Sequence, residues 1–149
     1  MRLQAWDRIL FVECGDGWIA EECWRRAARA YVFGVDRSSR QVAAARQLRQ
    51  VPGKLEFDTW DGSRLPVPDS GFDRVMARCV PVAPGDAAAL MREVQRALRP
   101  DGDAYLLHAV SDAAHLGRSL ARTGLTDLRE LGRSDDRSRM LTRARAGLR

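Results

Sequence analysis

Short apolar segments alternate along the chain with segments of helical periodicity, and this alternation restricts the fold more than any other feature. It predicts βαβ units arranged around a largely parallel sheet. The last two apolar segments are joined by a polar turn, GRSDDR, so we expect an antiparallel hairpin at one edge. The predicted strands are Arg8–Glu13, Tyr31–Asp36, Lys54–Thr59, Phe72–Ala77, Ala104–Val110, Thr126–Leu131 and Ser138–Arg145. The predicted helices are Trp18–Ala30, a helix from Ser38 or Ser39 to Gln50, Asp86–Arg99 and Asp112–Thr123.

Length and composition narrow the class of protein. A chain of 149 residues, 45% hydrophobic and 30% charged, fits one globular domain over residues 1–149. No apolar run approaches the roughly 18 residues that cross a bilayer, and the first residues lack the pattern of a signal peptide. We therefore expect a cytoplasmic protein with no membrane partner.

Basic residues outnumber acidic ones, which raises the question of nucleic-acid binding. The net charge is +5, but 24 of the 25 basic residues are arginines spread along the chain among aspartates. This even spread is not the clustered patch that binds nucleic acid, so we expect no such partner. The cysteines and the two histidines have no metal-ligand spacing, and we expect reduced thiols and no metal site.

Three acidic residues fall where the predicted strands end. Glu13 ends the first strand, Asp36 ends the second, and Asp61 follows shortly after the third. In an open parallel sheet, ligands bind at the carboxyl ends of the strands. We therefore expect these three carboxylates to line one rim of the sheet.

The residues around those carboxylates suit an adenosine. Gly15 and Gly17 open the first helix and direct backbone N–H groups toward a ligand. Asp36 follows about twenty residues later, where a carboxylate accepts both ribose hydroxyls. The pair Asp61–Gly62 offers an acceptor and a donor for the amine and ring nitrogen of adenine.

At this point the chain resembles the class I, Rossmann-like, S-adenosylmethionine-dependent methyltransferases, in particular the branch of small-molecule and quinone C-methyltransferases. RILFVECGDGW resembles the first motif of that family and VFGVDRSS the second. FDTWDGSRLPVPDSGFDRV resembles the third motif with its following strand, and MREVQRALRPDGDAYLL a late helix, turn and strand.

The resemblance implies a three-layer α/β/α sandwich around a mostly parallel seven-stranded sheet of order 3-2-1-4-5-7-6, with the last strand antiparallel. It implies S-adenosylmethionine as cofactor, S-adenosylhomocysteine as product, and a methyl acceptor that the sequence does not name. The implied cofactor-binding residues are Glu13, Gly15, Gly17, Asp36, Arg37, Asp61, Gly62 and Arg78.

The first motif departs from the family pattern D-x-G-x-G-x-G, and two registers fit it. In one, Glu13 stands for the acidic residue that helps to hold the methionine amino group. In the other, Phe11 stands for the acid and Glu13 for the first glycine. The second register, which we favour slightly, makes Glu13 either a substitute ligand for the ammonium group or an obstruction.

The resemblance also implies an N-terminal lid, for which this sequence offers only about seven residues before the first strand. We expect a shallow cofactor cleft that a large substrate, a protein partner or a second copy of the chain covers.

No residue stands out as catalytic. Methyl transfer is an in-line displacement, so positioning is the main device. Arg78 is expected to hold an anionic substrate or to pair with Asp61 or Asp73, His108 to be structural, and Cys79 to be a core residue.

Two other functions stay open. One is a non-catalytic or partner-dependent methyltransferase-like binding module. The other is an NAD- or FAD-binding protein, because Gly15-x-Gly17-x-x-Ala20 and Asp36 also satisfy the dinucleotide fingerprint.

Overall fold

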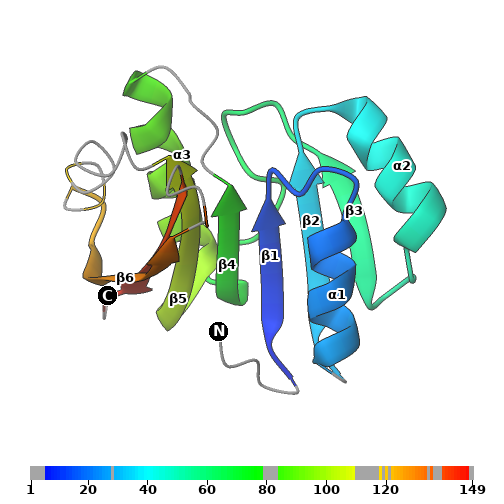
Figure 1. The fold of residues 1–149 in the computed structure, drawn as a ribbon, viewed down its shortest axis with the longest axis horizontal. Helices are drawn as coiled ribbons and strands as arrows, with labels where there is room; N and C mark the ends of the chain where they lie inside the picture. Colours follow the sequence, from blue (N-terminus) through cyan, green and yellow to red (C-terminus); the bar gives the residue numbers. More distant parts are fainter. Residues whose placement is uncertain are drawn as a thin grey trace.

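One mixed sheet runs through the computed structural model, which describes residues 6–27, 29–78, 84–109, 118, 120, 122–133, 135 and 139–147. Its seven strands lie in the order β3-β2-β1-β4-β5-β7-β6 (Figure 1). The strands are β1 (Arg8–Val12), β2 (Tyr31–Asp36), β3 (Leu55–Thr59), β4 (Phe72–Arg78), β5 (Leu98–Ala109), β6 (Leu125–Arg133) and β7 (Arg139–Ala146). The described helices are α1 (Trp18–Arg26), α2 (Ser39–Arg49) and α3 (Pro84–Ala97).

The pairing confirms the predicted topology. Strands β3, β2, β1, β4 and β5 pair in parallel, whereas β7 pairs antiparallel with both β5 and β6. The last two strands therefore form the expected hairpin at one edge. Their register shifts twice, between Thr126 and Arg129 and between Glu130 and Gly132.

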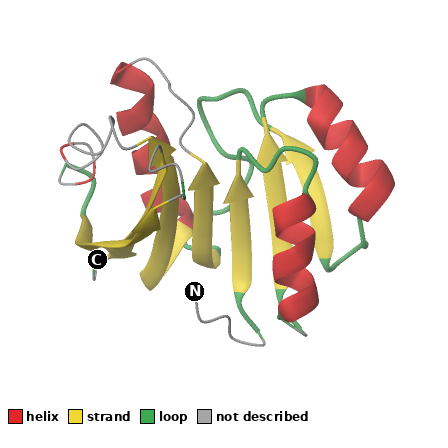
Figure 2. Cartoon of the chain, in the orientation of Figure 1, coloured by secondary structure: helices red, strands yellow, loops and turns green. Residues whose placement is uncertain are grey.

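The two faces of the sheet carry separate hydrophobic clusters, which define the expected three layers. Alternate side chains of a strand point to opposite faces. On β1, Ile9 and Phe11 belong to the cluster under α1 and α2, whereas Leu10 and Val12 belong to the cluster that includes α3. Figure 2 shows α1 and α2 beside β1 to β3, and α3 at the other end of the sheet.

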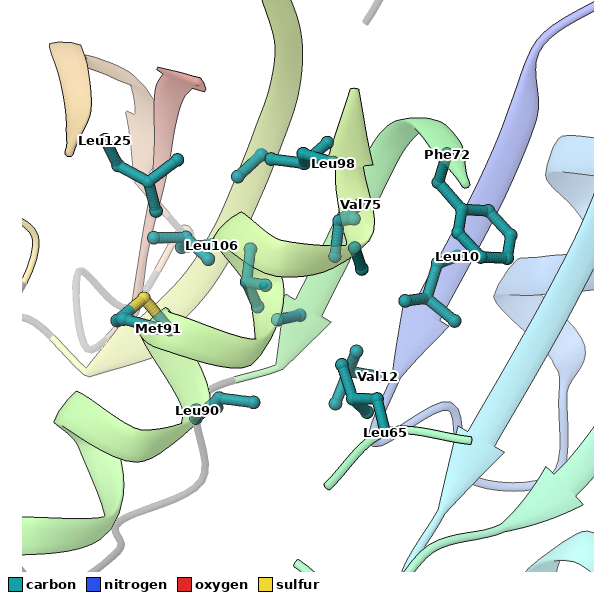
Figure 3. Close-up of a cluster of buried hydrophobic side chains, with 14 of the residues drawn as sticks. Leu10, Val12, Leu65, Phe72, Val75, Leu90, Met91, Leu98, Leu106 and Leu125 are labelled. Atoms are coloured by element: carbon teal, nitrogen blue, oxygen red, sulfur yellow. The ribbon is translucent and has the colours of Figure 1, made fainter. Parts of the chain in front are cut away.

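The cluster on the α3 side is the larger core. Met91 of α3 packs there with Val75 of β4 and Leu106 of β5, and all three side chains are fully buried (Figure 3). Leu65, from the segment between β3 and β4, lies close to Val12 in the same view. The core thus extends to the carboxyl end of β1, where the predicted site begins.

Most element boundaries differ from the prediction by one or more residues, and three of these differences have a clear local cause or consequence. The first strand ends at Val12, because Glu13 has φ of 59° and leaves the extended conformation. Helix α1 ends at Arg26, because Ala27 has φ of −110° and ψ of 85°. The helix expected to reach Arg99 ends at Ala97, and β5 begins at Leu98, which pairs with Phe72 ahead of a register shift.

Two expectations cannot be compared with the structure in full. Most of the predicted helix Asp112–Thr123 lies outside the described residues, and so does Cys79. Within the described part of the chain, no helix is both long and apolar enough to cross a bilayer.

Candidate functional site: the carboxyl edge of β1, β2 and β3

The turn between β1 and α1 is built by two left-handed glycines. Gly15 has φ of 60° and Gly17 has φ of 79°. Gly17 is also the N-cap of α1, and a Cβ atom at this position would lie 2.6 Å from the ring of Phe57 on β3. Glycine at position 17 thus lets the turn pack directly against β3.

Asp36 locks this turn to the end of β2. Its Oδ2 accepts a hydrogen bond of 2.8 Å from the Gly15 backbone N–H, and its Oδ1 accepts one of 2.9 Å from the Ser38 N–H. The residue is buried, at 5% exposure. Ser38, one of the two serines at which this helix is expected to begin, is the N-cap of α2, and its hydroxyl accepts from the Gln41 N–H at 3.3 Å. The carboxylate is therefore fixed beside the glycine turn, where the sequence predicts it.

Glu13 reaches across the same edge. Its Oε1 accepts a hydrogen bond of 2.7 Å from Arg37 Nε and one of 3.2 Å from Trp60 Nε1. Arg37 follows β2 and Trp60 follows β3, so the three side chains connect the ends of three adjacent strands. We call this group the Glu13–Arg37–Trp60 bridge. The sequence gives no sign of the role of Trp60.

Asp61 and Gly62 form a tight turn after β3. Asp61 Oδ1 accepts hydrogen bonds from the Ser63 hydroxyl at 2.6 Å and the Ser63 N–H at 2.8 Å. These bonds hold the pKa of the exposed Asp61 carboxyl below its ordinary value. Gly62 has φ of 89°, and a Cβ atom there would lie 3.3 Å from Arg37 Cδ. The Arg37 side chain thus extends from Glu13 toward Gly62.

Glu93 and Arg96 of α3 form a clasp that binds the segment after this turn, at Leu65 and Val67. Glu93 Oε2 accepts from the Leu65 N–H at 2.8 Å. Arg96 donates to the backbone oxygens of Leu65 and Val67 at 3.0 and 2.8 Å, and to Glu93 at 2.7 Å. Burial alone would raise the pKa of Glu93, but the bonds from Arg96 and Leu65 outweigh it and lower that pKa. Leu65 and the pair Glu93 and Arg96 lie in two of the sequence segments that resemble the family. The sequence does not reveal that these two segments are in contact.

A cavity of about 350 Å³ lies over the glycine turn. Its lining residues are Cys14, Gly15, Asp16, Trp18, Ile19, Gln41 and Arg78. Two of them expose apolar surface, since Trp18 is 60% exposed and Ile19 is 45% exposed. Burial, with the nearby charge of Asp36, raises the pKa of the Cys14 thiol to about 12, so this thiol stays protonated at neutral pH.

Arg78 lies near the turn, since a Cβ atom at Gly15 would be 3.4 Å from its Nη2. It does not make the two pairings considered from the sequence. Asp73 pairs with Arg99 at 2.8 Å, and Asp61 bonds Ser63.

His108 has a structural role, as predicted. It is buried, at 1% exposure, near the end of β5. Its Nδ1 lies 2.8 Å from the Ala109 carbonyl oxygen and its Nε2 lies 2.9 Å from the Thr142 hydroxyl. The tautomer in which Nδ1–H donates and Nε2 accepts satisfies both ring nitrogens.

The edge therefore brings together the polar groups that the sequence analysis expects for an adenosine. Asp36, Asp61 and Gly62 lie at successive strand ends, as an adenosine requires. The left-handed φ of Glu13 supports the second register of the first motif, with Phe11 buried in the core at the place of the acid. The Glu13–Arg37–Trp60 bridge connects the ends of β1, β2 and β3 beside these groups.

The fold and this edge define a methyltransferase-like α/β protein, and comparison with known families makes the assignment. The family described as "Methyltransferase domain" matches residues 9–102, well over half of the chain. The chain belongs to this family, whose cofactor is S-adenosylmethionine.

Individual relatives agree with the family. Methyltransferase GfsG of Streptomyces halstedii is 34% identical over 107 residues, which are 67% of this chain but only 37% of that protein. A S-adenosylmethionine-dependent methyltransferase from Methanosarcina mazei shares the fold with a TM-score of 0.78 and 20% identity, over 99% of this chain and 95% of its own. A methyltransferase from Haloferax volcanii, solved with the Trm112 methyltransferase activator, has a TM-score of 0.77 and 17% identity. The match covers 99% of this chain and 86% of that one.

Proposed function

We propose that this chain binds S-adenosylmethionine at the carboxyl ends of β1, β2 and β3 and transfers its methyl group to an acceptor that the site does not identify. The observation that carries the proposal is the Asp36 carboxylate, fixed by the Gly15 N–H at 2.8 Å beside the turn that leads into α1. Each carboxylate oxygen has a further lone pair. Asp36 is thus ready to accept ribose hydroxyls without losing its present bonds.

The remaining polar groups extend the same site. The ionised Asp61 and the neighbouring Gly62 N–H suit the amine and ring nitrogen of adenine. The cavity over Gly15, about 350 Å³, falls in the usual range of roughly 300–1,000 Å³ for ligand sites. Arg78 at its wall suits a carboxylate such as that of the methionine moiety.

When bound, S-adenosylmethionine supplies an electrophilic methyl group on a sulfonium. The contribution of the chain is to hold and orient the cofactor, since in-line displacement gains most from correct geometry. We assign the role of general base to no residue of this edge; His108, near the end of β5, is held by hydrogen bonds at both ring nitrogens. A general base is needed only for an acceptor that arrives protonated.

Isothermal titration calorimetry with S-adenosylmethionine, S-adenosylhomocysteine and NAD tests the proposal. We expect micromolar binding of the first two and none of NAD. Asp36→Ala should abolish binding, whereas Asp58→Ala, which removes a carboxylate from β3 that pairs with Arg46, should leave it unchanged. Circular dichroism of both variants verifies the fold. Binding of NAD alone, or of none of the three, contradicts the proposal.

A second candidate function is a binding module that needs a partner for activity. Two observations favour it: the Glu13–Arg37–Trp60 bridge occupies the edge, and Trp18 and Ile19, which line the cavity, expose apolar surface. The Haloferax volcanii neighbour, solved with an activator protein, gives a precedent for a partner on this fold. Size-exclusion chromatography with light scattering would detect a second copy that covers the cavity.

The dinucleotide alternative is weakened by topology. The dinucleotide fold has strand order 3-2-1-4-5-6 with parallel strands. Here β7 is inserted antiparallel between β5 and β6. Cytoplasmic location and the absence of a nucleic-acid partner stay predictions.

A further inference from the structure

Glu13 occupies a backbone position that suits glycine. It is the first residue after β1, and its φ of 59° is in the left-handed region that side chains with a Cβ rarely adopt. A left-handed residue with a long charged side chain needs contacts that offset its strain. Glu13 has such contacts, since its side chain is only 10% exposed and accepts two hydrogen bonds.

Those contacts lie in the path of a nucleoside. The ribose-binding carboxylate, Asp36, is at the end of β2, and the adenine-binding turn, Asp61–Gly62, follows β3. A nucleoside held by both must cross the ends of β2 and β3. The bridge crosses the same ends, because Glu13 reaches Arg37 and Trp60, and Arg37 Cδ lies against Gly62.

The bridge is built so that it can open. Arg37 is 42% exposed in its side chain, so water screens its ion pair with Glu13. Trp60 gives up a single hydrogen bond of 3.2 Å. Opening the bridge breaks these contacts, and it leaves intact the bonds of Asp36 to Gly15 and Ser38, which do not involve Glu13.

We propose that Glu13 is the residue that limits cofactor affinity: its carboxylate, held by Arg37 and Trp60, closes the nucleoside part of the site and is displaced when the cofactor binds. This inference rests on the proposed function. In this view Glu13, which stands in place of a glycine, competes with the cofactor for the site.

The test compares the binding of S-adenosylhomocysteine to the wild type, Glu13→Gly and Glu13→Gln by calorimetry. Glu13→Gly removes both the obstruction and the backbone strain, and its affinity should rise at least tenfold. Glu13→Gln keeps the bulk and weakens the pairing with Arg37, so its affinity should fall between the other two. The matched control is Asp101→Gly, which relieves another left-handed residue, with φ of 62°, outside this edge, and should bind as the wild type does.

A second readout follows the bridge itself. The indole N–H resonance of Trp60, assigned with Trp60→Phe, should move when the wild type is saturated with S-adenosylhomocysteine. Without ligand, it should already be shifted in Glu13→Gly, because its acceptor is gone.

The outcomes separate the inference from the proposed function. If the wild type binds and Glu13→Gly binds equally or more weakly, Glu13 is a ligand or a bystander, and the inference is overturned while the proposed function stands. An unmoved Trp60 resonance at saturation overturns the inference in the same way. If neither protein binds, the proposed function fails, and the bridge is not what excludes the cofactor.

Discussion

The ring of Phe57 lies directly beside Gly17, and this contact sets how closely the turn after β1 approaches β3. Position 17 needs glycine for two separate reasons, its left-handed φ and the missing space for a Cβ. Gly53, with φ of 73°, has the first requirement alone, since nothing lies within 4 Å of a Cβ there. The two glycines therefore separate backbone strain from packing.

We expect Gly17→Ala to lower the free energy of unfolding by about 1–3 kcal/mol more than Gly53→Ala. Both substitutions place a Cβ on a left-handed residue, but only the first overpacks a core ring. Urea unfolding monitored by circular dichroism measures both. Equal losses would show that Phe57 moves aside without cost.

At the scale of elements, the clasp formed by Glu93 and Arg96 holds the segment after β3 to α3. This segment carries Asp61 and Gly62 at its start, so the clasp supports one side of the candidate site. The bonds of the clasp reach three backbone groups of the segment, at Leu65 and Val67. Its stability should depend on the charge of Glu93.

Because the pKa of Glu93 is lowered from 4.5, its contribution to stability is complete above pH 4.5 and is lost as the pH falls through its value in the folded state. We expect Glu93→Gln to lower the free energy of unfolding by about 1.5–3 kcal/mol at pH 7. The difference from the wild type should shrink below pH 4.5. Urea unfolding across this pH range measures it.

Glu22→Gln is the control for the clasp, because Glu22 pairs with Arg26 on the surface of α1. A difference between the wild type and Glu93→Gln that stays constant with pH would mean that the charge of Glu93 is irrelevant.

At the scale of the whole molecule, Asp103 connects three strands through buried charge. It is 4% exposed and pairs with Arg74 of β4 at 2.6 Å and Arg143 of β7 at 2.7 Å. Arg74 also lies 3.3 Å from Asp7, just before β1. This network lies at the end of the sheet opposite the candidate site, and it holds the antiparallel β7 against the parallel strands.

We expect Asp103→Asn to lower the free energy of unfolding by about 3–5 kcal/mol, because it removes a buried carboxylate that pairs with two half-buried guanidinium groups and leaves Arg74 with Asp7 alone. Asp58→Asn should cost less than about 1 kcal/mol, since its pair with Arg46 is about half exposed on both sides. Chemical denaturation compares the two. Similar losses would show that the network adds no more than a surface pair.

The sequence predicts the architecture well because its signals are local. The alternation of strands and helices, the acid at the end of β2 and the cap at Ser38 each depend on neighbouring residues. The acid at the end of β2 is Asp36, and its place beside Gly15 follows from the adjacency of the first two strands.

The parts that the sequence misses depend on distant contacts. Trp60 meets Glu13 only because β3, β2 and β1 are adjacent and Glu13 turns left-handed. The clasp joins Glu93 to Leu65 only after α3 packs on the sheet. The sequence also places the end of β1 one residue late. Glu13 follows an apolar run and so resembles the last residue of the strand, and only its left-handed φ shows that the strand has already ended.

The two shifts of register in the terminal hairpin affect how the molecule meets its own copies. A straight outer strand presents evenly spaced amide and carbonyl groups, onto which a strand of another molecule can add. In β6 that spacing is interrupted twice, and Asp127 adds a left-handed residue with φ of 52°. At the opposite border, β3 is only five residues long. Neither edge strand offers a long regular row of backbone groups to which strands of other molecules can add. At high protein concentration the chain should therefore resist the formation of fibres.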